Sequence, residues 1–229
     1  MLATLTLLTP ALDLLLPIGR FGGLIWPVVA SVLLPTGRDH AALHAVTGQI
    51  ERLRIEAAQT DGPVELLAVV AGGSGAPASI TELSLNDWRH TLDANFTTAF
   101  LTLRAFLPSM IERQLGSVVT MSSTSGRLPS RSSPAYGAAN AGLQMLTRQA
   151  ALQIAPCNVR VNAIAPGAAL TDRLSQMPTH VGDGVAAQHP LGRLGHPADI
   201  AAAALFLLSD AFSWITAITL DASGGRTAL

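Results

Sequence analysis

Short apolar runs alternate with longer, helically patterned segments along most of the chain. Runs of Val, Ile and Leu with few polar breaks are typical of strands that are buried on both faces of a parallel sheet. This pattern predicts strands at Thr4–Leu8, Ser31–Leu34, Ala42–Val46, Glu65–Val70, Ser117–Met121, Arg160–Ile164 and Ile218–Leu220.

Between these runs, apolar residues recur every three or four positions, as in amphipathic helices. Pro178–Leu194 is rich in Gly, His and Pro, which predicts a loop or lid. The alternation of strands and helices predicts an α/β fold with a doubly wound, Rossmann-like parallel sheet and right-handed crossovers. No linker interrupts the pattern, so we expect residues 1–229 to form a single domain. The expected helices are Leu14–Val28, Ile50–Gln59, Leu85–Gln114, Pro134–Ala155 and Pro197–Ser209.

Composition limits the partners of this fold. Of the 229 residues, 49% are apolar and 13% charged, too little charge to coat a monomer, so we expect a dimer or tetramer. A net charge of −1 favours neither nucleic acid nor an anionic membrane as partner. The single Cys157 suits a reducing, cytoplasmic location. The apolar first 30 residues lack a basic start and are interrupted at Pro10, Asp13 and Pro17, which favours buried core over a membrane anchor.

One segment carries recognisable chemistry. The stretch VVTMSSTSGRLPSRSSPAYGAANAGL, Val118–Leu143, resembles the active-site strand and helix of the short-chain dehydrogenase/reductase family. In that family a serine, a tyrosine 13 residues later and a lysine four residues after the tyrosine form the catalytic set. Ser123 and Tyr136 have this spacing, but Asn140 stands where the lysine would be. Because a carboxamide carries no charge, we expect Tyr136 to be a neutral hydrogen-bond donor at pH 7.

Further segments extend the resemblance over most of the chain. LNDWRHTLDAN, Leu85–Asn95, resembles the family helix whose asparagine belongs to the catalytic set, and NAIAPGAALT, Asn162–Thr171, resembles a segment that meets the nicotinamide. Pro190–Asp210 and Ile218–Gly225 resemble the C-terminal signature. The resemblance implies a Rossmann-like fold, an NAD(P)-dependent oxidoreductase ancestry and tetramers built through the two long helices and the last strand.

The N-terminal half departs from the family pattern. The glycine-rich phosphate loop of the family aligns with Thr9–Leu16, where Pro10, Leu14 and Leu16 replace its glycines. The segment 38–71 is also short, as if one helix were missing. We therefore expect no cofactor, and whether Gly19, Gly22 and Gly23 form a displaced phosphate loop is left open. The remnants of the cofactor site would be Thr9, Gly72, Pro166, Gly167 and Thr171.

These departures favour an enzyme that works without a cofactor. Ser123 and neutral Tyr136 would donate hydrogen bonds to a substrate carbonyl, with Asn95 and Asn140 completing the site, in a dehydration, isomerisation, cyclisation or decarboxylation of a polyketide-like compound. Two alternatives remain: a non-catalytic partner subunit of an active family member, and an NAD(P)H-dependent ketoreductase with atypical cofactor binding. No histidines have metal-ligand spacing, so no metal site is expected. Candidate bases in the substrate loop are Asp172, His180, Asp183 and His189.

Overall fold

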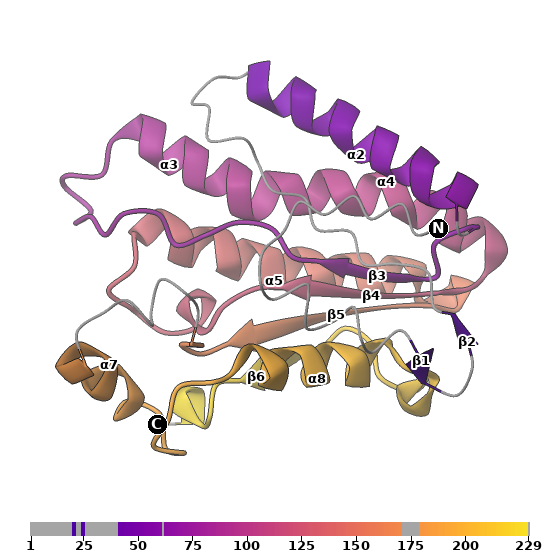
Figure 1. The fold of residues 1–229 in the computed structure, drawn as a ribbon. Coiled ribbons are helices and arrows are strands. Elements are labelled where there is room, and N and C mark those ends of the chain that lie inside the picture. The colour runs from indigo at the N-terminus through magenta and orange to yellow at the C-terminus, as the bar shows by residue number, and fades with distance from the viewer. Residues whose placement is uncertain (1–19, 22–23, 26–40, 61, 171–178, 229) are drawn as a thin grey trace.

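A four-stranded parallel sheet forms the centre of the molecule (Figure 1). The computed structural model describes residues 20–21, 24–25, 41–60, 62–170 and 179–228. The strands follow one another in the order β3-β4-β5-β6. Their bounds are Leu66–Val69 for β3, Gly116–Met121 for β4, Val159–Pro166 for β5 and Thr219–Ala222 for β6.

The helices cover the two faces of this sheet unequally. Figure 1 shows α3, α4 and α5 on one side and α8 on the other, while α2 packs on α4. The remaining short elements are the strands β1 and β2, the helix α7, the π-helical turn η2 (Asp93–Thr97) and several 3-10 turns, of which η3 follows β4. The bounds are β1 Arg20–Phe21, β2 Leu24–Ile25, α2 Ala41–Thr60, α3 Leu85–Leu92, α4 Thr98–Arg113, η3 Thr124–Gly126, α5 Pro134–Ile154, η4 Ala155–Cys157, α7 Thr179–Ala186, α8 Pro197–Leu208, η5 Asp210–Phe212 and η6 Arg226–Ala228.

The alternation of side chains along the strands divides the core in two. In β4, Val118 packs with the side chains of α4 and α5, whereas Val119 packs with Leu207 and other residues of α8. Both valines are at most 1% exposed. Since successive side chains of a strand point to opposite faces, a run apolar at both positions is stable only with both faces covered. The prediction of a single α/β unit with a covered parallel sheet is confirmed.

The connections between strands differ in hand. The chain steps in the same direction from β4 to β5 and from β5 to β6. It passes over one face through α5 and over the opposite face through α8 (Figure 1). The two crossovers therefore have opposite hands, and the expectation that all of them are right-handed was wrong.

Helix α2 corrects two expectations about the N-terminal half. Ala42–Val46, predicted as a strand, is part of this 20-residue helix, and the helix thought to be missing is present. Short apolar runs do not distinguish a buried strand from a buried helix turn. Val46, Ile50 and Ala57 are buried at helical spacing against the core, so tertiary packing decided the structure.

Two further segments differ from expectation. Residues 20–25, placed in a predicted helix, include the antiparallel pair β1 and β2, with Arg20 opposite Ile25. Thr179–Ala186, predicted as part of a loop, forms α7 despite two glycines. The predicted strands Thr4–Leu8 and Ser31–Leu34 lie outside the described residues.

Candidate functional site

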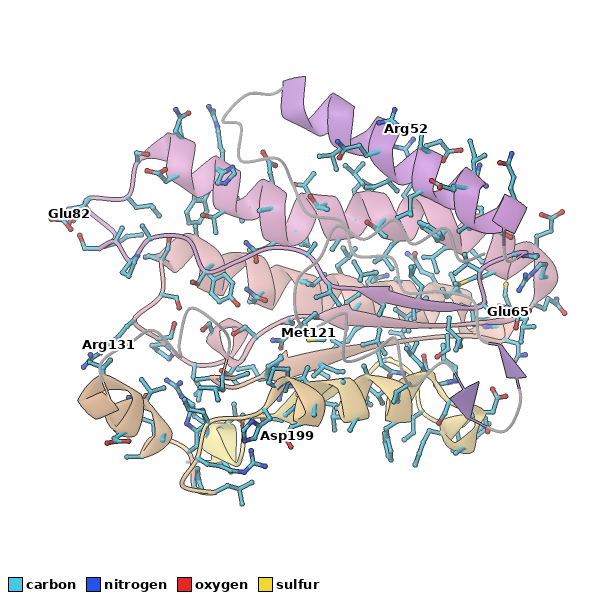
Figure 2. The ribbon with its side chains drawn as sticks, viewed as in Figure 1. Arg52, Glu65, Glu82, Met121, Arg131 and Asp199 are labelled. Atoms are coloured by element: carbon cyan, nitrogen blue, oxygen red, sulfur yellow. The ribbon has the colours of Figure 1, made fainter. Side chains whose placement is uncertain are left out.

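The candidate site lies where parallel strands end together. In Figure 2, Glu65 marks the start of β3 at one end of the sheet and Met121 marks the end of β4 toward the other. Ligands of open α/β sheets bind outside the carboxyl ends of the strands. Ser122 and Ser123 directly follow Met121, so the sheet delivers two adjacent hydroxyls to this edge.

The two serines have different roles. Ser122 Oγ donates to Asn140 O (3.1 Å) and accepts from Gln144 Nε2 (2.9 Å), so its donor and acceptor functions are both used within the fold. Ser123 Oγ accepts from Ser125 N (3.1 Å), a bond that leaves the hydroxyl hydrogen of Ser123 unspent. Ser123 is therefore the serine equipped to donate to a ligand.

Tyr136 lies in the first turn of α5, close to η3, the turn that directly follows Ser123 and is called the serine turn below. Helix α5 begins with Pro134, and Ser133 Oγ accepts from Ala135 N (3.3 Å) as its cap. A Cβ at Gly126 would lie 2.7 Å from the backbone of α5 between residues 140 and 141, and one at Gly137 would lie 3.1 Å from Ser125 O. The turn after Ser123 thus packs directly on the helix that carries the half-buried Tyr136.

Asn140 lies within this contact. Its side chain is 2% exposed, and its Nδ2 donates to Tyr136 O (2.9 Å) one helical turn earlier. The Asn140 side-chain amide therefore bonds to the backbone of its own helix. Position 140 therefore carries a neutral amide where the family pattern has a lysine ammonium.

Asn95 supports the loop after β3. It lies in a π-helical turn, Asp93–Thr97, between α3 and α4. Both hydrogens of Nδ2 are donated, to Gly73 O (3.1 Å) and Thr91 O (2.9 Å), and Oδ1 accepts from Gly73 N (3.1 Å). Gly72 has φ +104°, and a Cβ there would overlap Asn95 Oδ1. The geometry gives Asn95 a structural role beside the site, and Gly72 is required for its close approach.

His189 is engaged on both ring nitrogens. It is 3% exposed, its Nε2 accepts from Ala168 N (3.2 Å), and Nδ1 donates to Val185 O (2.9 Å). This arrangement fixes a neutral tautomer and ties the end of α7 to the segment after Pro166 and Gly167. A ring that is bonded in this way is not free to act as a general base.

Of the other candidate bases, the structure describes Asp183 and His180. Asp183 is exposed on α7, and His180 belongs to the same helix. Thr9, Thr171, Asp172 and the three glycines at 19, 22 and 23 lie outside the described residues.

Gln144 and Arg127 were missed by the sequence reasoning. Gln144 is 5% exposed on α5, and its Nε2 donates to Ser122 Oγ and to Ser123 O. Arg127 Nε donates to Gln144 Oε1 (3.2 Å). The available signal was a polar residue on the buried stripe of α5, directly after Leu143.

The described residues contain neither a metal site nor a membrane-spanning helix. No group of three or more His, Cys, Asp or Glu side chains within them is placed to hold a metal ion. In the same part of the chain, no helix combines the length and apolar character needed to cross a membrane.

Comparison with known proteins places this geometry in a family. The profile of the family described as enoyl-(acyl carrier protein) reductase matches residues 45–227. The chain is 36% identical over 180 residues to cis-4-hydroxycyclohexanecarboxylate dehydrogenase of Sinomonas cyclohexanicum, covering 79% of this chain and 72% of the relative. It is 35% identical over 149 residues to 2,5-dichloro-2,5-cyclohexadiene-1,4-diol dehydrogenase of Sphingobium indicum, covering 65% of this chain and 60% of that relative's length.

A solved structure agrees. The 3-oxoacyl-[acyl-carrier protein] reductase of Brucella melitensis superposes with a TM-score of 0.75 at 25% identity, over 88% of this chain and 82% of that one. The profile match begins at residue 45 and so does not test the alignment of Thr9–Leu16 with a phosphate loop.

These relatives overturn the expected cofactor-independent lyase, isomerase or cyclase. They are named as dehydrogenases and reductases, which agrees with the ketoreductase alternative. The changes at position 140 and in the N-terminal loop had favoured cofactor-independent chemistry, but the serine, the tyrosine and the strand ends of the family are retained. The match over 183 residues and the shared fold lead to one conclusion: the chain belongs to the short-chain dehydrogenase/reductase family.

Proposed function

We propose that the protein is an NAD(P)-linked oxidoreductase that interconverts a ketone and a secondary alcohol. The observation that carries this proposal is the packing of the Ser123 turn on the first turns of α5, which places an unspent serine hydroxyl beside the tyrosine helix. The names of the relatives in Sinomonas and Sphingobium both describe alcohols on six-membered rings. We therefore assign a small alicyclic ketone or alcohol as the substrate class.

The described residues fit a nicotinamide at the strand ends. Gly72 and Gly73 follow β3 and are exposed, and Pro166 and Gly167 end and follow β5 at the same edge. These residues would hold the cofactor, which supplies or accepts the hydride when bound. The ribose side differs from the family pattern because Asn140 is neutral and bonded to Tyr136 O. This proposal replaces the expectation that no cofactor binds.

The residues of the chain would act on the substrate oxygen. The Ser123 hydroxyl donates a hydrogen bond to the carbonyl oxygen, and Tyr136 donates its proton to the same oxygen as negative charge develops there.

The test is turnover of cyclohexanone-type ketones with NADH and NADPH, followed through cofactor absorbance. Tyr136→Phe and Ser123→Ala should each lower turnover about a hundredfold, since each removes one donor aimed at the oxyanion. Ser125→Ala is the matched control. Among the described residues the Ser125 hydroxyl bonds Ser130 alone, in an exposed position, and Ser125 contacts Ser123 through its backbone amide. Full activity of Tyr136→Phe, or no nicotinamide oxidation with any ketone, would contradict the proposal.

Cytoplasmic location and assembly into oligomers remain predictions. Assembly into oligomers accords with the exposed apolar residues on α4 and α5, among them Phe100, Met145 and Leu152.

A further inference from the structure

The amide of Gln144 is fully used in holding the serine turn. Its Nε2 donates to Ser122 Oγ (2.9 Å) and to Ser123 O (3.1 Å), and its Oε1 accepts from Arg127 Nε (3.2 Å). The residue is buried on α5, two turns after Tyr136. The Gln144 side chain, which projects from the helix that carries Tyr136, therefore holds the backbone of Ser123 through a hydrogen bond.

Arg127 fixes the orientation of that amide from the other side. Its guanidinium also donates to Thr219 O (3.1 Å) and pairs with Asp221 Oδ2 (3.7 Å) on β6. Thr227, in the C-terminal turn η6, donates to the same carboxylate. A continuous chain of polar contacts thus runs from Ser123 through Gln144 and Arg127 to the last strand.

These polar contacts affect the alignment of the Ser123 and Tyr136 hydroxyls. The Ser123 turn approaches α5 through Gly126, where there is no room for a Cβ. Small displacements of aimed donors cost large factors in rate, on the order of a hundredfold for about 1 Å. No cation at position 140 helps to orient Tyr136, so alignment depends on how firmly the turn is held on the helix.

We propose that Gln144 is a positioning residue that sets the Ser123 hydroxyl against Tyr136, with Arg127 locking the Gln144 amide. This inference rests on the proposed ketone reduction for its kinetic test alone. Neither residue touches the substrate; both act through the serine turn.

The kinetic test uses three variants of the whole chain. Gln144→Met removes the amide and should lower kcat about tenfold or more, while KM for NAD(P)H changes less than twofold. Gln144→Glu keeps the acceptor for Arg127 but has no donor when ionised. Its activity should fall at neutral pH and recover in part as the pH is lowered, because a protonated carboxyl donates one hydrogen bond again. Gln59→Glu, the same change at an exposed site on α2, should retain the parental kcat and pH profile.

A second measurement needs no activity. The amides of Ser125, Gly126 and Arg127 bond within the serine turn, to Ser123 Oγ (3.1 Å), Ser123 O (3.0 Å) and Thr124 O (2.9 Å). In Gln144→Met their hydrogen exchange should accelerate about tenfold or more, while the amides of β5 exchange as in the parent.

The two failures are distinguishable. If the parent reduces no ketone, the proposed function fails, and hydrogen exchange still decides the role of Gln144. If the parent is active and the Gln144 variants keep its kcat, its pH profile and its exchange rates in the serine turn, the positioning role is refuted. A uniform acceleration of exchange throughout the chain would show general destabilisation and would equally overturn the inference.

Discussion

At position 140 a buried carboxamide donates to Tyr136 O, where the family pattern has an ammonium group. This single neutral group changes what the neighbouring phenol can do, because a nearby cation would stabilise its ionised form. The contacts of Ser123 do not involve the Asn140 side chain. Ser123 Oγ accepts from Ser125 N, and Ser123 O accepts from Gln144 Nε2.

The effect of residue 140 can be measured directly, because Tyr136 is the only tyrosine of the chain. In Asn140→Lys the absorbance titration of the phenol should shift to lower pH by about one unit or more relative to the parent, owing to the added cation. NAD(P)H-dependent ketone reduction should increase with it. Asn140→Met introduces a neutral side chain close to lysine in length, and its phenol should titrate as in the parent. An Asn140→Lys protein with the parental titration curve would mean that the new ammonium does not reach the phenol.

At the scale of elements, α8 begins with a charged cap. Asp199 Oδ2 accepts from His196 N (2.7 Å) and from Arg193 (2.7 Å), and Asp199 Oδ1 accepts from Arg193 (3.3 Å). The Arg193 guanidinium first, and the His196 N–H second, lower the pKa of Asp199 to about 2. A carboxylate at a helix N-terminus also interacts favourably with the helix dipole.

The depressed pKa of Asp199 sets the direction of a pH effect. Its contribution to stability should be complete above the unfolded value of about 4 and be lost as the pH falls toward 2. Asp199→Asn should therefore have a lower Tm than the parent at pH 6, and the difference in Tm should shrink as the pH falls from 4 to 2. Thermal unfolding across this range checks the prediction, with the exposed Asp183→Asn as control. A difference in Tm that grows toward low pH would have the wrong sign.

At the scale of the whole molecule, apolar side chains remain uncovered on the outer helices. Phe100 on α4 is 44% exposed, and Met145 and Leu152, seven residues apart on one face of α5, are 60% and 68% exposed. Burial of this face in an oligomer would account for the low charge content of the chain.

We expect the parent to sediment as a dimer or tetramer at micromolar concentration, and the double variant Met145→Glu, Leu152→Glu to sediment as a smaller species. Introducing two charges on this face would leave them desolvated in an interface. Ile80→Glu, at a residue 72% exposed between β3 and α3, is the control that should keep the parental assembly. Monomeric parent protein would contradict the prediction. Co-purification with an active family member would instead favour a mixed oligomer.

The pattern of apolar residues was sufficient to predict the covered parallel sheet and most elements after residue 60. Continuous apolar runs such as those of β4 and β5 are stable only between two helical layers, so their pattern predicts the architecture. The resemblance to the family's serine–tyrosine segment also selected Ser123, Tyr136 and Asn140, which lie in one uninterrupted strand, turn and helix.

Other features depend on contacts between segments that are distant in the sequence. The helical state of Ala42–Val46 came from burial of Val46 and Ile50 in the core, which a short apolar run does not specify. The opposite hands of the α5 and α8 crossovers depend on which sheet face is free to receive α8. His189 and Gln144 took their roles from partners 21 and 22 residues away, Ala168 and Ser122. A hydrogen bond between distant segments is set by how the elements pack, and no local pattern of polar and apolar residues encodes it.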